Sequence, residues 1–185
     1  MAESRKIIAF LTAHEGIEQV ELTQPWQAVI DAGATPKLLS TVEAGQTVQA
    51  FDHLDKADTF TVDTSVSQAS VADYDGLVLP GGVANPDALR LDSAAVEFVK
   101  EWVHAGKPVA AVCHAPWTLI EAGVVAGKTL TSWPSLAADL TNAGASWVDA
   151  EVQVCPTNGW TLVTSRNPAD LPAFNRALVS AFGLD

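Results

Sequence analysis

Residues 107–117 read Lys-Pro-Val-Ala-Ala-Val-Cys-His-Ala-Pro-Trp, and this stretch decides the fold. The run of small and β-branched residues that ends at Cys113 predicts a short strand buried on both faces. Pro116 favours the first turn of a following helix, where its missing N–H has no partner to lose. Ala111 and Ala115 lie two residues before and after Cys113, and small residues at these places are typical of a sharp turn that carries a nucleophile. The stretch therefore predicts a strand, a tight turn at Cys113 and a helix.

Cys113 has surroundings that can activate a thiol. A free cysteine has a pKa of about 8.5, and a helix N-terminus or a neighbouring cation lowers it to roughly 3.5–7.5. Because the turn places Cys113 directly before a helix, we predict a reactive nucleophile. The alternative is an inert core cysteine, a common place for this residue. Cys155 has no such turn around it, and we interpret it as structural.

The composition indicates one globular unit. A chain of 185 residues, 48% hydrophobic and 17% charged, is long enough for one sizeable core, and we expect residues 1–185 to form a single domain. The net charge of −12 disfavours nucleic acid and anionic membranes as partners, because both attract basic surfaces. Neither end resembles a signal peptide, and no apolar run is long enough to span a bilayer. Two widely separated cysteines favour a reducing compartment, so we expect a cytoplasmic protein.

Outward from residues 107–117, apolar runs alternate with segments of helical periodicity. Strands are predicted at residues 5–13, 35–40, 75–80 and 109–113, with shorter ones at 59–62, 127–133 and within 147–163. Helices are predicted at residues 18–32, 93–104, 135–143 and 171–182. This alternation predicts an α/β fold, a three-layer sandwich with a mostly parallel sheet and helices on both faces.

Short signals predict how some of these elements begin and connect. Asp92 or Ser93 is expected to cap the helix at 93–104, because both side chains accept hydrogen bonds from free helical N–H groups. Asp170 is expected to cap the last helix for the same reason. Asn158-Gly159 predicts the turn of a hairpin.

Three loops rich in chemical side chains follow predicted strands: residues 14–21, residues 81–87 and the turn at Cys113. Function gathers at the carboxyl ends of the strands in a parallel sheet, so we expect these loops to form one site. Gly81-Gly82 has two interpretations. The glycines are turn residues, or they expose amide N–H groups to a developing oxyanion.

Glu15, Glu18 and Glu21 are spaced by three residues near the start of a predicted helix. One interpretation is a solvated acidic first turn, which the helix dipole favours. The other is that one carboxyl lies beside Cys113. Burial and like charge would then raise its pKa, and its protonated form would donate a hydrogen bond to the sulfur.

The histidines carry a weaker signal. His114 follows Cys113, but neighbouring side chains leave the backbone in different directions, so adjacency alone does not predict a Cys–His pair. No histidine follows residue 114, which excludes a triad completed by a downstream histidine of the same chain. A metal cluster of His14, Glu15 and Glu18 has no established ligand spacing, and we predict no metal site. No site role is expected for His53 and His104.

Four motifs in order along the chain match one family. They are Glu-Gly-Ile-Glu-Gln-Val-Glu-Leu at 15–22, Leu-Val-Leu-Pro-Gly-Gly at 77–82, Val-Cys-His-Ala-Pro at 112–116 and Thr-Ser-Arg-Asn-Pro-Ala-Asp-Leu at 164–171. On these residues the chain resembles the PfpI superfamily from about Lys6 to Phe182. The resemblance implies a flavodoxin-like sheet of the class I glutamine amidotransferase type, with the cysteine on a nucleophile elbow.

The resemblance also implies roles for single residues. It makes Cys113 the reactive cysteine and Glu21 the carboxyl that hydrogen-bonds it, while Glu18 lines the same pocket. The amides of Gly82 and His114 would form the oxyanion hole, and the His114 side chain would assist proton transfer.

The resemblance leaves three functions open, because its members share a fold and a nucleophile but not an activity. The first is a stress-response hydrolase that acts on glycated or carbonyl-modified substrates, deglycase-like or glyoxalase-like, through attack by Cys113. The alternatives are a cysteine peptidase or amidase, and a non-enzymatic oxidation sensor or chaperone that works through oxidation of Cys113. Small-molecule or glycated-protein substrates are expected, with no cofactor.

The resemblance further implies a homo-oligomer, a dimer or a larger ring. In some relatives an acid that follows the Pro-Gly-Gly loop reaches the histidine of a neighbouring subunit. Asp87 occupies this place, with a side chain one methylene shorter than the Glu of some relatives. Asp87 is therefore the candidate intersubunit acid for His114.

Overall fold

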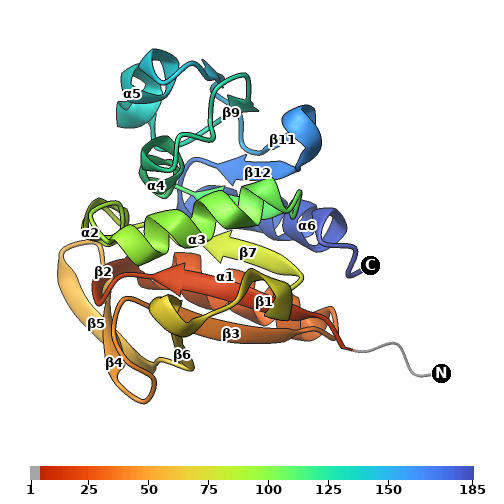
Figure 1. Ribbon diagram of the computed structural model, residues 1–185. Helices are drawn as coiled ribbons and strands as arrows, with labels where there is room; N and C mark the ends of the chain where they lie inside the picture. The colour runs from red at the N-terminus through yellow and green to blue at the C-terminus, as the bar shows by residue number, and fades with distance from the viewer. Residues whose placement is uncertain (1–4) are drawn as a thin grey trace.

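The computed structural model describes residues 5–185, and its centre is a seven-stranded sheet in the order β11-β12-β8-β7-β1-β3-β6 (Figure 1). All neighbours in this sheet pair in parallel except β11 and β12. The run β3-β1-β7-β8-β12 has the 2-1-3-4-5 order of flavodoxin-like sheets. The predicted α/β fold with a mostly parallel sheet is confirmed. The strands are β1 (Ile7–Thr12), β3 (Thr35–Ser40), β6 (Thr64–Ser65), β7 (Gly76–Leu79), β8 (Val109–Val112), β11 (Gln153–Cys155) and β12 (Leu162–Ser165).

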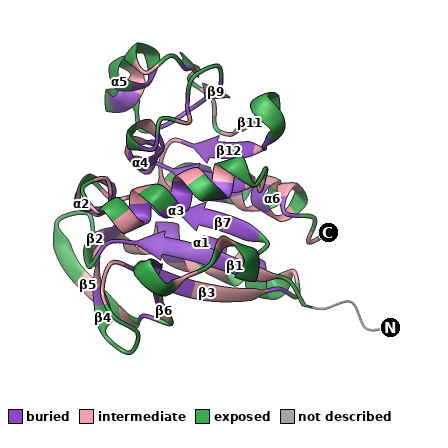
Figure 2. Ribbon diagram, in the orientation of Figure 1, coloured by how far each residue is buried: buried purple, intermediate pink, exposed green. Residues whose placement is uncertain are grey.

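Helices cover both faces of this sheet (Figure 1). α1 (Gln19–Asp31) and α6 (Leu171–Ala181) pack on one face, and α3 (Ser93–His104) and α4 (Pro116–Glu121) pack on the other. Because side chains alternate along a strand, each buried strand contributes to two cores. In β1, Ile8 packs in the core of α1 and α6, and Ala9 packs in the core of α3 and α4. Figure 2 shows the central strands buried.

A smaller sheet lies beside the first and is formed by β2 (Glu15–Glu18), β4 (Thr47–Asp52) and β5 (Asp55–Thr61). β4 and β5 form an antiparallel hairpin, which contains most of the antiparallel strand predicted at 59–62. β2 falls where the sequence predicted only a polar turn. It pairs in parallel with β4 and leads directly into α1. This sheet brings the tip of the β4–β5 hairpin to the carboxyl end of β1.

The segment between α4 and β12 is less regular than predicted. Only Thr129–Leu130 forms a strand, β9, within 127–133, and it pairs in parallel with β10 (Ser146–Trp147). α5 (Ala137–Asn142) covers most of the helix predicted at 135–143, and a short helix that the sequence did not indicate, α2 (Ala84–Leu89), follows β7. Within residues 5–185 no helix is long and apolar enough to cross a bilayer.

The predicted helix ends and turn have different outcomes. Asp92 caps α3 as expected, because its side chain accepts a hydrogen bond from the N–H of Ala95 at 2.9 Å. Asp170 is the N-cap residue of α6 as expected, but its side chain accepts no capping hydrogen bond from this helix. Its carboxylate instead accepts hydrogen bonds from the guanidinium of Arg166 at 2.9 and 3.0 Å, a charge-assisted fork stronger than a single cap bond. The hairpin at Asn158-Gly159 is confirmed, since β11 and β12 pair antiparallel around it.

Lys128 is a buried cation that ties β9 to the β11–β12 hairpin. Its Nζ donates to the main-chain oxygens of Cys155 at 3.3 Å, Trp160 at 2.6 Å and Thr157.

Lys128→Met should leave three carbonyls without this donor, so we expect the free energy of unfolding to fall by about 3 kcal/mol in urea titrations. The partly exposed Lys100→Met should change it by less than about 0.5 kcal/mol. Equal effects of the two variants would contradict this account.

Candidate active site

Cys113 lies in the turn between β8 and α4, and its backbone is in the left-handed region with φ 63°. Non-glycine residues rarely adopt this conformation, so the surroundings must hold it. Two main-chain hydrogen bonds do so. The N–H of Cys113 donates to the oxygen of Ser165 at 3.0 Å, and the Cys113 oxygen accepts the N–H of Trp133 at 2.9 Å. The turn aims the sulfur into a pocket, although only 6% of the residue is exposed.

The loops after β1, β7 and β8 meet at this turn without room for extra atoms. A Cβ at Gly81 would lie 2.6 Å from the Cβ of Cys113 and would also collide with the carboxylate of Glu21. A Cβ at Gly82, whose φ is 82°, would lie 2.7 Å from the backbone nitrogen of Glu18. Both positions therefore require glycine because neighbouring loops pack directly against them. This requirement is more specific than the need for glycine in an ordinary turn.

Asn85 ties two of these loops together from the first turn of α2. Its side chain is buried, accepts the N–H of Ala13 at 2.7 Å and donates to the oxygens of Pro80 and Gly81 at 2.9 and 3.0 Å. Asn85 is a positioning residue that the sequence did not reveal, because α2 carries no periodic pattern. An asparagine three residues after a Gly-Gly turn was the only available signal.

Glu21, in the first turn of α1, is fully buried against Cys113. Its Oε2 accepts the N–H of Gly82 at 3.2 Å, while Oε1 is buried without a conventional hydrogen-bond partner among residues 5–185. Burial, followed by the charge of Glu18, raises the pKa of Glu21 to about 8, and the Cys113 thiol is its side-chain hydrogen-bonding neighbour. At pH 7 the Glu21 carboxyl is therefore protonated and can donate to the sulfur.

The pKa of Cys113 is raised, first by burial and then by the charge of an ionised Glu21. The amide N–H groups of His114 and Gly82 act in the opposite direction, but burial outweighs them. The expectation that the helix N-terminus lowers the pKa of this thiol is thus wrong for the resting site. The repulsion by Glu21 exists only when its carboxyl is ionised. Cys113 therefore ionises most easily while Glu21 keeps its proton.

His114 lies beside the sulfur, contrary to the expectation that adjacent side chains diverge. Its Nδ1 is 3.2 Å from the Cys113 Sγ, because the left-handed turn folds the two side chains onto the same side. The imidazole is buried between two tryptophans. Its ring centroid lies 5.6 Å from that of Trp133, which stacks on it, and 5.2 Å from that of Trp117. Burial lowers the pKa of His114, so the neutral imidazole is present at pH 7 and can take the thiol proton.

The pocket above the sulfur has a volume of about 400 Å³. The β4–β5 hairpin contributes one wall through Phe51, His53 and Leu54, and the opposite side is formed by Trp133 and Pro168. These residues could not be grouped from the sequence, because they come from a second sheet and from loops far along the chain. Most of the lining is apolar.

Glu18 also lines this pocket and is only 12% exposed. Its Oε2 accepts the backbone N–H of His53 at 3.2 Å, and its Oε1 lies 3.3 Å from His53 Nδ1. With Asp52, these residues are the one group among residues 5–185 whose ligand atoms lie close enough together to hold a metal ion, within 4.8 Å of one another. Asp52 and His53 are exposed, and we assign no ion to the group.

Known proteins with similar sequences and structures identify the family of this chain. The model of the DJ-1/PfpI family matches residues 6–181. The chain belongs to this family. It is 40% identical over 183 residues to protein/nucleic acid deglycase 2 of Escherichia coli, which covers 97% of this chain and 99% of that protein. It is also 40% identical over 172 residues to general stress protein 18 of Bacillus subtilis, covering 93% and 94% of the two chains. The crystal structure of DJ-1beta from Drosophila melanogaster matches with a TM-score of 0.82 and 28% identity, over 97% of this chain and 92% of that one.

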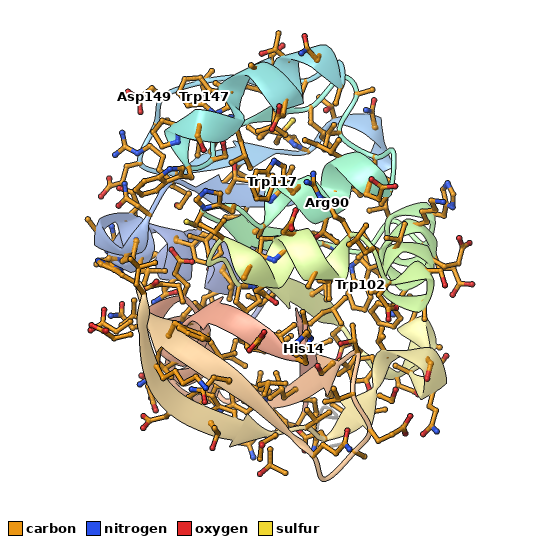
Figure 3. The ribbon with its side chains drawn as sticks, turned by 90° about the vertical axis from the view of Figure 1, so that its left-hand side faces the viewer. His14, Arg90, Trp102, Trp117, Trp147 and Asp149 are labelled. Atoms are coloured by element: carbon orange, nitrogen blue, oxygen red, sulfur yellow. The ribbon has the colours of Figure 1, made fainter. Side chains whose placement is uncertain are left out.

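Asp87, which the family resemblance suggested as an intersubunit acid, is engaged within its own chain. Its Oδ1 accepts a hydrogen bond from Arg90 at 2.8 Å, and 55% of its side chain is exposed. The Arg90 Cζ in turn lies over the Trp117 ring, 4.8 Å from its centroid. Both side chains are labelled in Figure 3. His114 forms no ion pair within residues 5–185.

The raised pKa of Glu21 predicts a stability that falls with pH. The native state holds a proton up to about pH 8, whereas the unfolded chain releases it near the ordinary value of 4.5. Between pH 6 and 7.5 Glu21 therefore binds about one proton more in the native state than in the unfolded chain. Its contribution to the free energy of unfolding should drop by about 1.4 kcal/mol per pH unit, and the lowered pKa of His114 offsets part of this drop in both proteins. Urea titrations of the wild type and Glu21→Gln at both pH values test this. A wild type that loses no more stability than Glu21→Gln would contradict the assignment.

Proposed function

We propose that this protein is a stress-response hydrolase whose Cys113 removes carbonyl adducts from amines and thiols. The observation that carries the proposal is the Cys113 Sγ 3.2 Å from the neutral His114 Nδ1, at the bottom of a pocket of about 400 Å³. The names of two relatives, a protein/nucleic acid deglycase and a general stress protein, support the same activity. A hemithioacetal or an aminocarbinol is the expected substrate.

The catalytic step follows from these positions. His114 Nδ1 takes the thiol proton as the Cys113 sulfur forms a bond to the carbinol carbon of the adduct, and the bond from that carbon to the amine nitrogen or thiol sulfur breaks. The amides of Gly82 and His114, which act on the sulfur as donors, are placed to stabilise charge beside it. The proton on His114 then passes to the departing amine or thiol. In the hemithioacetal left on Cys113, the carbinol C–H proton moves to the neighbouring carbonyl carbon through an enediol, which oxidises the first carbon to a thioester and reduces the second to an alcohol. Water then hydrolyses the thioester and frees Cys113. The adduct of a 2-oxoaldehyde takes up one water and yields the free amine or thiol and a 2-hydroxy acid, so no oxidant is needed.

Glu21 is proposed to tune the sulfur rather than to take its proton. Its carboxyl is neutral at pH 7 and donates toward Cys113, which stabilises the thiolate as it forms. A carboxylate at the same place would repel the thiolate. Glu18 is proposed as a pocket residue.

A cytoplasmic homo-oligomer, dimer or larger, is part of this proposal. Because His114 pairs with no acid among the described residues 5–185, a neighbouring subunit is the proposed source of one, and Asp87 is the candidate if it exchanges Arg90 for that contact. Size-exclusion chromatography with light scattering checks the oligomeric state. If the monomer were active, catalysis would not need an acid from a neighbouring subunit, and the proposed role of Asp87 would be rejected.

The experiment that tests the function follows release of a free amine from a purified methylglyoxal adduct of an arginine peptide, under reducing conditions. Such adducts also release free aldehyde spontaneously, so a scavenger must remove this aldehyde throughout. A deglycase should release the amine faster than the spontaneous rate. Release limited to the spontaneous rate, with consumption of added methylglyoxal, would indicate a glyoxalase. Cleavage of peptide bonds alone would indicate the peptidase alternative.

A further inference from the structure

The Cys113 pocket has an unusual balance of charge. No lysine or arginine lines it, and its acidic side chains are Glu18 and Glu21. Glu21 is neutral at pH 7, which leaves the carboxylate of Glu18 as the acidic charge at the wall. A charge at a largely apolar wall acts strongly on a ligand, because little water screens it.

The basic residues on segments that border the pocket are paired elsewhere. Arg90 donates to Asp87 and stacks on Trp117. Arg166, two residues before the lining residue Pro168, is held by Asp149 at 2.7 Å and by Asp170. In this structure, therefore, each guanidinium already has a carboxylate partner outside the pocket.

Glu18 is held toward the pocket rather than mobile at its rim. The backbone N–H of His53 fixes Oε2 at 3.2 Å, and the carboxylate is mostly buried between α1 and the β4–β5 hairpin. His53 Nδ1 lies near Oε1, but 79% of its side chain is exposed, so water screens its ring. Trp133 also lines the pocket, and its aromatic ring is a further group that attracts a cation.

We infer that Glu18 determines specificity by charge, so that the pocket prefers adducts bearing an ammonium or guanidinium group and disfavours adducts bearing carboxylate or phosphate. This inference rests on the proposed function for its substrates, but the charge selection itself belongs to the pocket. Adducts on lysine-rich or arginine-rich peptides are the class it favours.

Three methylglyoxal hemithioacetals of similar size test the inference: those of thiocholine, a cation, 2-mercaptoethanol, a neutral thiol, and 3-mercaptopropionate, an anion. For the wild type we expect kcat/KM to be at least about tenfold higher with the cationic substrate than with the anionic one. A ratio of this size is what one partly buried charge pair can produce. Glu18→Gln should bring this ratio to within about threefold of one. Glu18→Asp, which keeps the charge, should preserve the preference.

Glu15→Gln is the matched control, because it removes the same charge from an exposed position of the same segment that does not line the pocket. It should leave the ratio unchanged. A ratio equal in the wild type and Glu18→Gln, or a preference for the anion, would overturn the inference.

A second readout separates this inference from the proposed function. Methanethiosulfonate reagents form a mixed disulfide with Cys113 and release methanesulfinate, whether or not the protein is a hydrolase. The trimethylammonium reagent should modify Cys113 about tenfold faster than the sulfonate reagent, relative to free cysteine, and Glu18→Gln should abolish the difference. If no hemithioacetal is turned over but this ratio holds, the proposed function fails and the charge selection stands. Equal relative rates for both reagents would reject the charge selection.

Discussion

Replacement of Cys113 by alanine is expected to reduce adduct hydrolysis by about a thousandfold or more. The Cys113 thiol is the proposed nucleophile, and removal of a nucleophile typically leaves little beyond binding and electrostatic stabilisation. Amine release from the purified adduct, with free aldehyde scavenged, provides the measurement. Cys155→Ala is the matched control.

The two cysteines differ in position, since only Cys113 lines the pocket. Cys155 is buried at the edge strand β11, where its sulfur accepts the N–H of Thr129 at 3.3 Å, and it does not line the pocket. Its variant should retain activity within about twofold. Residual activity of Cys113→Ala near the wild-type rate would show that the chemistry belongs to another group.

The second large effect is expected at Gly81. An added Cβ would lie 2.6 Å from the Cβ of Cys113 and 2.8 Å from the oxygen of Val112, both backbone-bound atoms that cannot move aside alone. Overpacking of this kind costs about 3 kcal/mol when the neighbours are rigid. Gly81→Ala should therefore lower the free energy of unfolding by about this amount. In the folded fraction it should also slow alkylation of Cys113 at least tenfold, because it displaces Glu21 and the turn.

Gly45→Ala is the matched control for Gly81→Ala. Gly45 has φ 85° and open space around it, so its cost is the left-handed conformation alone, about 1–2 kcal/mol. Alkylation of Cys113 should be unchanged in this variant. If Gly81→Ala were no more destabilising than Gly45→Ala and kept full reactivity, the close approach of the three loops would be wrong.

Much of the fold was predictable because its signals are local. A run of small and β-branched residues and a proline at the first helical position determined the strand and helix around Cys113, and both are present as β8 and α4. The alternation of strands and helices then led to the parallel sheet. The sequence missed β2, β4, β6 and α2. Of these, β2 and α2 are short and owe their form to tertiary partners, namely β4 and the loops at Asn85.

The site was predictable where topology governs it. Cys113, Glu21 and Gly82 follow three parallel strands, so the carboxyl end of the sheet brings them together. His53 could not be predicted, because it reaches the pocket from a hairpin of another sheet. The pairing of Asp170 with Arg166 depends on tertiary packing as well. The direction of the Cys113 pKa was mispredicted since burial, which no local pattern reports, outweighs the helix N-terminus.

The central claim is that a protonated Glu21 keeps Cys113 reactive. The most direct test is the rate of Cys113 alkylation by iodoacetamide between pH 6 and pH 10, followed by peptide mass spectrometry in the wild type and Glu21→Gln. Because Glu21 ionises near pH 8, the wild-type rate should level off above that pH, whereas the rate of Glu21→Gln, which stays neutral, should keep rising. A wild-type rate that continues to rise through pH 8 in parallel with Glu21→Gln would contradict the account.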